Sequence, residues 1–405
     1  MPESIVKDKS LAKQGRSNIE FAELEMAALL KIRERFAREK PLKGIRVGMA
    51  LHVTKETAVL VRTLMAGGAQ VAITGCNPLS TQDDVAAALA EEGVSVFAYK
   101  GETKADYYRF LNKVIDFRPQ ITIDDGCDLV TEIHTKHSGM IKEIIGGAEE
   151  TTTGIIRLKA MERDKALKYP IIAVNDNKTK HLVDNYYGTG QSTIDGILRA
   201  SNVLFAGKTL VVAGYGSCGK GVALRAKGLG VRALQAVLDG FRVMPMSEAE
   251  RLGDIFVSVT GGRHAITLAH MKAMKDRAML FNAGHFDIEI DLAGLGKASS
   301  SRKKVRPFLD EYVLSGKKIF VGGEGRLINL AAAEGHPSAV MSLSFCGQAM
   351  AVEYLVKNKL APKVHTLPVE IDDEIAKIAL EAMGIRKDSL TAEQKKYLES
   401  WQHGT

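Results

Sequence analysis

The chain has 405 residues, too many for a single hydrophobic core, so we expect two or three domains. Hydrophobic residues make up 45% of it and charged residues 25%, which excludes disordered and fibrous classes. The net charge of +7 comes from basic residues interspersed with acidic ones, so we expect a solvated surface and no nucleic-acid partner.

The four cysteines, Cys76, Cys127, Cys218 and Cys346, lie far apart in the sequence. No pair has the short spacing of a zinc site and nothing favours a disulfide, so we expect no bound metal. Free thiols fit a reducing compartment, and the first residues lack the apolar core of a signal peptide. Because no apolar run reaches membrane-spanning length, we expect a cytoplasmic protein with no membrane partner.

Residues 19–40 predict one long amphipathic helix, since their apolar positions recur at intervals of three and four. Pro41 and Gly44 end this helix. Strands and helices then alternate, which is typical of an open parallel sheet. The predicted strands cover residues 46–50, 71–74, 94–98 and 121–123, and the predicted helices cover 56–64, 82–91 and 105–117.

Polar segments follow three of these predicted strands, beginning near His52, Cys76 and Asp124. Each has a purely structural explanation: His52 alone suits a hydrogen-bonded core histidine, and Asp83 in the second segment suits a helix start. The carboxyl ends of parallel strands face a common crevice, however. The three segments together therefore predict a ligand site at that edge.

Residues 149–154, with the sequence EETTTG, predict a loop because three threonines make a poor helix interior. The threonine hydroxyls either bind a ligand or bond the local backbone, and the sequence leaves both open. After a predicted strand at 171–174, Lys180 and Asp184 have the spacing of residues on one helix face. A lysine beside a carboxylate on the surface of a cleft is a candidate proton shuttle.

A glycine-rich turn follows the apolar, β-branched run at 210–213, which predicts a buried strand. Gly214, Gly216 and Gly219 have G-x-G-x-x-G spacing, and a predicted helix covers 220–227. These glycines allow a tight turn, close approach of a pyrophosphate and close helix–strand packing. With a strand before and a helix after, the motif predicts a dinucleotide site at the helix N-terminus.

Further strands are predicted within 253–261, 278–284 and 318–321, which extends the second α/β unit. His285 follows the middle strand, a common place for a catalytic histidine in a nucleotide-binding fold. The segment from Glu370 onward is charged and predicts helix. It is too small for a core of its own, so we expect it to pack on another subunit.

Many of these segments together resemble the S-adenosyl-L-homocysteine hydrolase family. The resemblance covers nearly the whole chain, and the segments occur in the family's order. They are LHVTKETAVL, CNPLSTQDD, DDGCDL, EETTTG, NDNKTKHLVDNYYG, VVAGYGSCGKG, GHFDIEID, EGRLINLAAAEGHPSAVM and LTAEQKKYL.

The resemblance implies an NAD-binding Rossmann-type domain inserted in a second parallel α/β substrate domain, with a small C-terminal helical tail. The implied limits are 1–180 with 335–365 for the substrate domain, 190–333 for the NAD domain and 366–405 for the tail. It also implies a homotetramer. The implied reaction is the reversible hydrolysis of S-adenosyl-L-homocysteine to adenosine and homocysteine, with NAD oxidising and then reducing the ribose 3′ carbon.

Residue roles also follow from the resemblance. Lys180 and Asp184 would deprotonate and orient the 3′-hydroxyl, while Asp125 and His52 would transfer protons at C4′ and C5′. Glu150 would bind the ribose hydroxyls, and His285, near the pair of Lys180 and Asp184, would complete the catalytic set. The implied substrate-binding residues are Thr54, Glu56, Asn175 and His336, and the implied NAD contacts are Thr151, Thr152, Thr153, Asn185, Gly214, Gly216, Ser217, Cys218, Gly219, Ala283, Gly284, His285 and Asn329.

The sequence departs from the family pattern in three places. Thr189 replaces a cysteine of many members, and the chain ends at Thr405 without the tail of long-form members, so a short form with weaker cofactor retention is expected. After Gly230, residues 233–238 predict a helix where the family has a second Rossmann strand ending in an acidic residue. About ten residues are missing against βαβ spacing. Asp239 is the nearest acid, and the surrounding match places it elsewhere.

Three functions therefore stand side by side: an active hydrolase, a non-catalytic relative with impaired NAD binding, and a plain NAD-dependent dehydrogenase. The third would lack the set of Asp125, Lys180 and Asp184. The preference for adenine or hypoxanthine, and so for S-inosyl-homocysteine, is open, because family members differ at Glu334 beside the expected base pocket.

Overall fold

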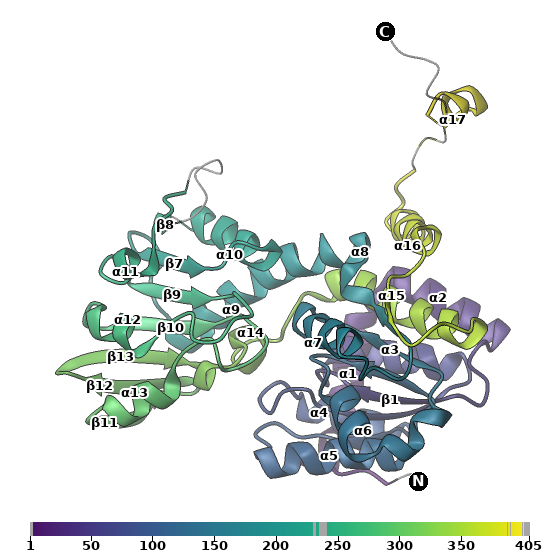
Figure 1. Cartoon of the computed structure of the whole chain (residues 1–405), viewed down its shortest axis with the longest axis horizontal. Coiled ribbons are helices and arrows are strands. Elements are labelled where there is room, and N and C mark those ends of the chain that lie inside the picture. The colour runs from purple at the N-terminus through teal and green to yellow at the C-terminus, as the bar shows by residue number, and fades with distance from the viewer. Residues whose placement is uncertain are drawn as a thin grey trace.

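The computed structural model describes residues 3–229, 232–234, 241–386, 388, 390–398 and 400, and Figure 1 shows two lobes side by side. Each lobe is built on one seven-stranded sheet. Successive residues of a strand point to opposite faces and enter different apolar clusters, as Val71 and Ala72 do in the first lobe. Leu210 and Val211 do the same in the second. The central strands of both sheets are therefore buried on two faces, and the predicted α/β class with a Rossmann-type unit is confirmed.

The first lobe has a sheet in which every pairing is parallel. Its strand order is β14 (Val364–His365), β6 (Ile171–Ala173), β5 (Gly146–Glu149), β4 (Ile121–Asp124), β1 (Arg46–Ala50), β2 (Gln70–Thr74) and β3 (Ser95–Phe97). The chain runs outward from β1 to β3 and then returns to the other side of β1 with β4. The topological switch point thus lies between β1 and β4, where ligands bind in such sheets.

The second lobe has a mixed sheet with its own switch point between β7 and β9. Its strand order is β11 (Ser301–Arg306), β12 (Leu309–Leu314), β13 (Lys317–Gly322), β10 (Ala278–Asn282), β9 (Ile255–Ser258), β7 (Thr209–Ala213) and β8 (Arg232–Leu234). The pairs β11–β12 and β12–β13 are antiparallel, and the other pairs are parallel.

Helices fill the connections of both sheets. In chain order they are α1 (Ala12–Glu25), α2 (Ala27–Glu39), α3 (Lys55–Ala66), α4 (Asp83–Glu91), α5 (Lys104–Asp116), α6 (Asp128–Lys136), α7 (Thr152–Arg163), α8 (Lys178–His181), α9 (Thr189–Ser201), α10 (Ser217–Gly228), α11 (Met246–Ala249), α12 (Leu268–Ala273), α13 (Leu292–Ala298), α14 (Ile328–Ala331), α15 (Ser338–Lys357), α16 (Val369–Ala382) and α17 (Ala392–Leu398). Short helical turns are η1 (Lys9–Leu11), η2 (Ser138–Glu143), η3 (Val174–Asp176), η4 (Asp184–Gly188) and η6 (Gly323–Gly325).

Two predictions of local structure were wrong in the first lobe. The single helix predicted for 19–40 is two helices, because the chain breaks at Met26, whose φ of −108° and ψ of 36° are not helical. Met26 is fully buried, so the break inserts an apolar side chain into the core. The EETTTG segment is not all loop, since α7 begins at Thr152 and places two threonines in a helical first turn.

The helix predicted for 233–238 was also wrong where the structure describes it. Residues 232–234 form β8, which pairs in parallel with β7 from Thr209 to Val211. The second Rossmann strand is therefore present and has three residues. Residues 235–240, which include Asp239, lie outside the described residues, and the sequence places Gln235 directly after the strand.

Some elements were not predicted at all. They include the strands β5 and β14, the antiparallel hairpin of β11 and β12, and the helices α6, α9 and α15. Helix α10 was predicted but starts at Ser217 rather than at residue 220. The glycine-rich sequence of β5 and the charged sequence of β11 carry little strand signal. The predicted alternation of strands and helices elsewhere is confirmed to within a few residues.

Helix α15 is long and apolar enough to cross a membrane by length and composition, contrary to the expectation from sequence. It is instead mostly buried in the first lobe, where it packs on α2 and α3. Leu355 and Cys346 of this helix are fully buried in the apolar core. A core helix of a large lobe gives the same composition as a membrane span.

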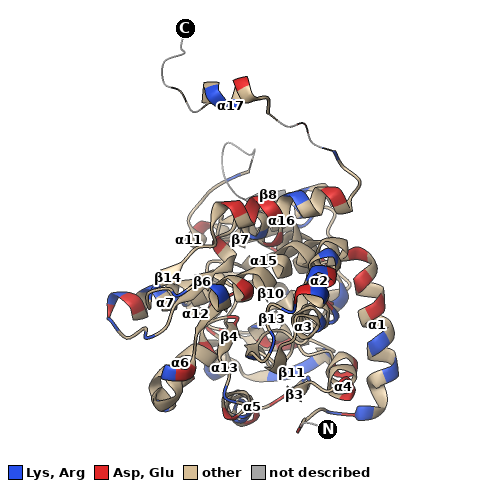
Figure 2. Ribbon diagram, turned by 90° about the vertical axis from the view of Figure 1, so that its right-hand side faces the viewer, with Lys and Arg blue, Asp and Glu red and all other residues tan. Residues whose placement is uncertain are grey.

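Charged side chains of both signs are interspersed along the outer helices, as Figure 2 shows for α1, α2 and α16. All four cysteines are free thiols. Both observations agree with what the composition indicated.

Candidate active site

One cavity of about 670 Å³ lies between the lobes and is lined by residues of both. Most residues singled out in the sequence line it, although they come from segments between residues 51 and 345. Asn175 and Gly219 are the two exceptions. Asn175 lies behind the wall and accepts from Lys180, and Gly219 packs α10 against the glycine turn, where a Cβ would overlap the carbonyl oxygen of Gly214.

The first cluster in the cavity gathers at the switch point of the first lobe. His52 follows β1 and Asp125 follows β4, and these strands are neighbours. The Asp125 carboxylate lies 3.3 Å from His52 Nε2 and 3.6 Å from Nδ1 of His285, which comes from the second lobe. His52 Nδ1 lies 2.8 Å from Ser80 Oγ and 3.2 Å from Cys76 Sγ. The three polar segments predicted to face one crevice do meet there.

Burial controls the charge of this cluster. It lowers the pKa of His52 to about 4, although the Asp125 carboxylate opposes the shift, so His52 is neutral at physiological pH. Burial, with the charge of Asp125, raises the pKa of the Cys76 thiol well above its ordinary value. The cluster thus holds one carboxylate, a neutral imidazole and a neutral thiol. These groups suit proton transfer near neutral pH.

The second cluster centres on Lys180, which lines the cavity as the sequence suggested but is only 4% exposed, so it is more deeply buried than a lysine on a cleft surface. Its Nζ lies 2.9 Å from Asp184 Oδ1, 3.0 Å from Asn185 Oδ1 and 3.5 Å from Glu150 Oε1. Short α8 ends at His181 and the chain continues through η4, yet the spacing of four still brings the lysine and Asp184 together.

The charges of this cluster depend on one another. Burial alone would lower the pKa of Lys180, but Asp184 and Glu150 outweigh it and hold that pKa above its ordinary value. Burial likewise opposes ionisation of Asp184, but the charge of Lys180 and the contact with His336 keep its pKa well below its ordinary value. The pKa of Glu150 is raised by burial, despite Lys180. Lys180 is therefore an ammonium ion in the resting cluster.

Several residues that hold this cluster had no signal in the sequence. Ser344 and Gln348 of α15 both donate to the Glu150 carboxylate. Asp372 of α16 accepts from the backbone N–H of Lys178 at 2.8 Å and of Thr179 at 3.3 Å, so it caps the helix that carries Lys180. These contacts join positions nearly 200 residues apart, which local patterns do not reveal.

The glycine turn forms the second-lobe wall of the cavity. Gly214 has a φ of +115°, and a Cβ there would stand 2.6 Å from the Val259 carbonyl oxygen, so only glycine fits. At Gly216 a Cβ would meet nothing within 4 Å, so the backbone is open toward the cavity. The next residue, Ser217, begins α10 and presents the helix N-terminus. This is the arrangement that holds a pyrophosphate.

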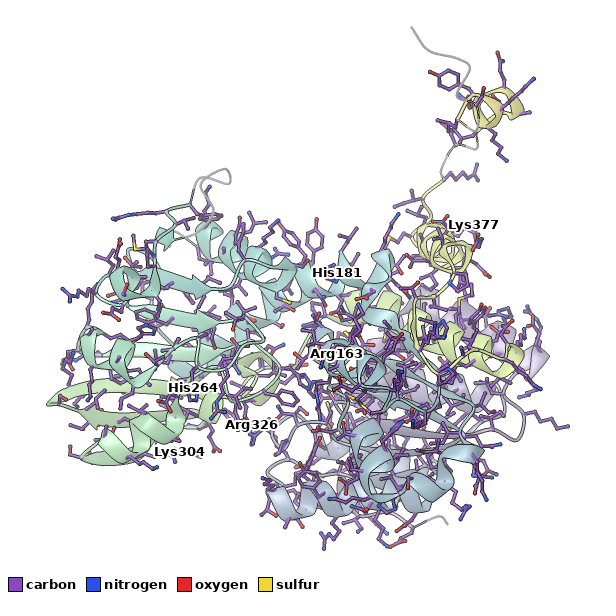
Figure 3. The ribbon with its side chains drawn as sticks, in the orientation of Figure 1. Arg163, His181, His264, Lys304, Arg326 and Lys377 are labelled. Atoms are coloured by element: carbon purple, nitrogen blue, oxygen red, sulfur yellow. The ribbon has the colours of Figure 1, made fainter. Side chains whose placement is uncertain are left out.

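Other residues of the wall support a dinucleotide. Asn329 lines the cavity, and its Oδ1 is buried without a hydrogen-bond partner among the described residues. Such an orphaned acceptor fits a ligand that donates a hydrogen bond. His181, which was not singled out in the sequence, lies between the lobes in Figure 3 and links Ser217 Oγ at 3.0 Å to the Asn185 amide at 3.2 Å. The residues present therefore fit NAD.

A third group lies at the far end of the first-lobe wall. Glu56 is 2% exposed and accepts from Ser338 Oγ at 2.6 Å. Lys55 Nζ contacts Glu56 at 3.4 Å and Glu334 at 2.7 Å. His336, expected near the same end, instead has its Nδ1 3.1 Å from Asp184 Oδ2 and its Nε2 3.3 Å from Thr189 Oγ1. It thus belongs by contact to the Lys180 cluster.

His52, Cys76 and Asp125 also have the composition of a metal site, since their ligand atoms lie within 4.8 Å of one another. This cluster could not be recognised from residue spacing, because Cys76 lies 24 positions after His52 and 49 positions before Asp125. The absence of a metal expected from the sequence stays a prediction.

Comparisons with known proteins agree on one family. Residues 3–138 match the family model of S-adenosyl-L-homocysteine hydrolase, and residues 185–335 match the model of its NAD binding domain. An adenosylhomocysteinase of Saccharolobus solfataricus is 57% identical over 414 residues, covering 99% of both chains. An S-inosyl-L-homocysteine hydrolase of Methanocaldococcus jannaschii is also 57% identical, with 99% of both chains covered. An adenosylhomocysteinase of Thermosynechococcus vestitus is 57% identical and covers 99% of this chain and 96% of its own.

Proposed function

Because this chain belongs to the S-adenosyl-L-homocysteine hydrolase family, we propose that it hydrolyses S-adenosyl-L-homocysteine reversibly to adenosine and homocysteine. One observation carries the proposal: the buried Lys180 cluster and the Asp125 cluster line the same cavity as the glycine turn. A plain dehydrogenase needs no second set of proton-transfer groups. The intact clusters also favour an active enzyme over a non-catalytic relative.

The cofactor is NAD, which would be held by the glycine turn, the N-terminus of α10 and Asn329. When bound, NAD supplies reversible oxidation of the ribose 3′ carbon, which makes the neighbouring C4′ proton acidic. Asn185 and Thr153 line the cavity and complete the wall on that side.

We assign to Lys180 the removal of the proton from the ribose 3′-hydroxyl. Asp184 orients the lysine amine, since its Oδ1 lies 2.9 Å from Lys180 Nζ. Glu150, with its carboxylate fixed by Ser344 and Gln348, accepts from the ribose hydroxyls. Because the pKa of Lys180 is held above its ordinary value, the ammonium must lose a proton before it acts as a base. The rate of this step is therefore expected to rise with pH.

We assign to Asp125 and His52 the transfer of protons at C4′ and at C5′, where homocysteine leaves and water adds. Their atoms lie 3.3 Å apart, so a proton passes between them without rearrangement. His52 is neutral because burial lowers its pKa to about 4, and a neutral imidazole accepts a proton readily. His285 contacts the same carboxylate from the other lobe and so encloses the reacting carbons.

Glu56 and Thr54 are assigned the base of the nucleoside. A carboxylate only accepts hydrogen bonds, so Glu56 pairs with the donating 6-amino group of adenine. One similar protein is named for the inosyl substrate, so the base preference needs its own test. Adenosine and inosine should be compared as substrates for synthesis with homocysteine, and an equal or higher kcat/KM for inosine would reject this assignment.

The activity is tested by product analysis of the purified chain with S-adenosyl-L-homocysteine. Equal amounts of adenosine and free thiol, with no net formation of NADH, are expected. Net NADH formation would indicate a dehydrogenase instead. No turnover with NAD bound would indicate a non-catalytic relative.

A cytoplasmic homotetramer is proposed as the working form. Its support is the apolar surface of the C-terminal helices, where Met383 and Leu398 are 63% and 68% exposed. Helix α17 has no buried residues and extends away from both lobes in Figure 1. Light scattering of the purified protein would test the assembly, and a monomer at micromolar concentration would contradict it.

A further inference from the structure

Two buried polar side chains close to Gly75, the residue before Cys76, have no role in the clusters above. Glu102 is 5% exposed and Thr81 is 1% exposed. Both carboxyl oxygens of Glu102 and the Thr81 hydroxyl have no hydrogen-bond partner among the described residues. Buried polar atoms are nearly always paired, because an unpaired one costs the full loss of its hydration. Two such side chains close together indicate a binding site for a polar ligand.

The two side chains face the same small space. Hydrogen bonds from the backbone N–H of Lys100 to Asp83 and of Gly101 to the Pro78 carbonyl, both 2.7 Å, fix the chain before Glu102. This places Glu102 beside the turn that follows β2. A Cβ on Gly75 would stand 3.2 Å from Thr81 Oγ1, 3.6 Å from Glu102 Oε1 and 3.7 Å from the Asn77 carbonyl oxygen.

A carboxyl, a hydroxyl and a carbonyl oxygen thus surround one side of the Gly75 backbone. Three acceptors match the three N–H donors of a primary ammonium group. Burial raises the pKa of Glu102 to about 8, so the unliganded acid is largely neutral at pH 7. An ammonium group beside it would favour the ionised form and gain a charge-assisted hydrogen bond.

The space lies next to the reacting end of the substrate. Gly75 precedes Cys76, whose Sγ lies 3.2 Å from His52 Nδ1 and 3.6 Å from Asp125 Oδ2. In the proposed function these two residues act at C4′ and C5′, and the homocysteine sulfur is attached at C5′. The amino-acid part of the substrate therefore extends from this point.

Arg326 is a candidate partner for the carboxylate of an amino acid whose ammonium group lies at Glu102. Arg326 belongs to the second lobe, and its positive charge acts on the Glu102 carboxyl. Figure 3 shows Arg326 at the side of its lobe that faces the first lobe. Its side chain is 30% exposed and pairs with Asp287 at 3.0 Å. A zwitterion needs one group of each sign, and these two residues supply them.

We propose that Glu102, with the Thr81 hydroxyl, binds the α-ammonium group of the homocysteine part of the substrate, and that Arg326 faces its α-carboxylate. This inference rests on the proposed function, because it assigns the part of that substrate which the two proton-transfer clusters do not contact.

The test uses the holoenzyme in the direction of synthesis, with adenosine and one of two thiols. Homocysteine carries the ammonium group, and 4-mercaptobutyrate lacks it. The variants are Glu102→Gln, which keeps the shape of the neutral acid, and Thr81→Val, with exposed Glu20→Gln as the matched control. We expect Glu102→Gln to raise the KM for homocysteine by roughly 10- to 100-fold, the value of a charged hydrogen bond, and that for 4-mercaptobutyrate by less than about 2-fold.

A separate readout keeps the two proposals apart. Adenosine alone should produce reduced enzyme-bound cofactor, seen at about 340 nm, to the same extent in the wild type and all variants. If this signal is absent in the wild type, the proposed function fails, and the ligand assigned here fails with it. If the signal is normal and Glu102→Gln changes both thiols equally, or neither, the ammonium site is overturned. Thr81→Val should reproduce the selective effect at smaller size, and no selectivity in either variant rejects the assignment.

Discussion

Replacing Lys180 by methionine removes one positive charge from a buried cluster while keeping most of the side-chain volume. Lys180 is 4% exposed and lies within 3.5 Å of two carboxylates that are themselves buried. Breaking a buried ion pair in this way costs about 3–5 kcal/mol, because a charge is left without its partner. The sequence alone suggested a lysine on the surface of a cleft, whose loss would leave the fold intact, whereas its burial predicts a loss of stability.

The loss of stability should depend on pH in a defined direction. Without Lys180, the folded-state pKa values of Asp184 and Glu150 rise, since its charge lowers both. A carboxyl group with a raised folded-state pKa binds a proton more readily in the folded protein, so its stability is kept at low pH and lost as pH rises. Wild-type Asp184 keeps its contribution throughout this range, because its pKa is already well below its ordinary value. The free energy of unfolding of Lys180→Met should therefore lie further below wild type near pH 8 than near pH 5.

Urea unfolding at the two pH values, followed by circular dichroism, measures this difference. Lys178→Met is the matched control, because Lys178 is an exposed lysine of the same short helix α8. Turnover of the Lys180 variant should fall by roughly 10²–10⁴-fold, the usual contribution of a general base. A pH-independent deficit, or retention of more than about a tenth of the wild-type rate, would refute the reasoning.

Three further outcomes are expected. Burial lowers the pKa of His52 from 6.5 to about 4, so the unfolded chain binds a proton that the folded chain does not between these values, and wild-type stability falls as pH falls through them. His52→Asn should remove up to about 3 kcal/mol of that fall in pH-dependent unfolding, and an unchanged slope would contradict it. Asp372→Ala should cost about 1 kcal/mol and also reduce turnover, because it uncaps α8, and normal turnover would count against positioning by α16. NAD titration by calorimetry should give weaker binding than in relatives with an acidic residue after the second Rossmann strand, since Gln235 follows β8 here, and equally tight binding would reject that role for the acid.

The sequence was informative wherever a signal was local. The glycine-rich turn predicted the cofactor side of the cavity, because these glycines are required by close local contacts. At Gly214, for example, a Cβ would collide with the Val259 carbonyl oxygen. Alternating strands and helices predicted which segments end at one sheet edge, so His52 and Asp125 could be placed together before the fold was known. The spacing of Lys180 and Asp184 predicted their contact even though the helix between them is interrupted.

The remaining features depend on contacts between distant segments. Burial of Lys180 arises from α15 and α16, which return to the first lobe after the second lobe is complete. The resemblance suggested a missing strand near Gly230, and pairing with β7 decided the matter for residues 232–234 against their helical sequence pattern. Thr81 lay in a polar segment at a strand end and Glu102 in none, and only the fold shows that both are buried without a hydrogen-bond partner among the described residues.

The path of the chain has a consequence for how the protein is made on the ribosome. The second-lobe strands all lie between residues 209 and 322, so that lobe is complete before α15 is synthesised. The first lobe begins earlier but waits for α15 to cover its core and for β14 to pair with β6. Its apolar face therefore stays open from residue 173, where β6 ends, to residue 357, where α15 ends, which is nearly half of the chain, although domains usually fold in the order of their N-termini. A nascent chain that stalls before residue 338 would carry a complete second-lobe sheet beside a first lobe whose apolar core is still uncovered.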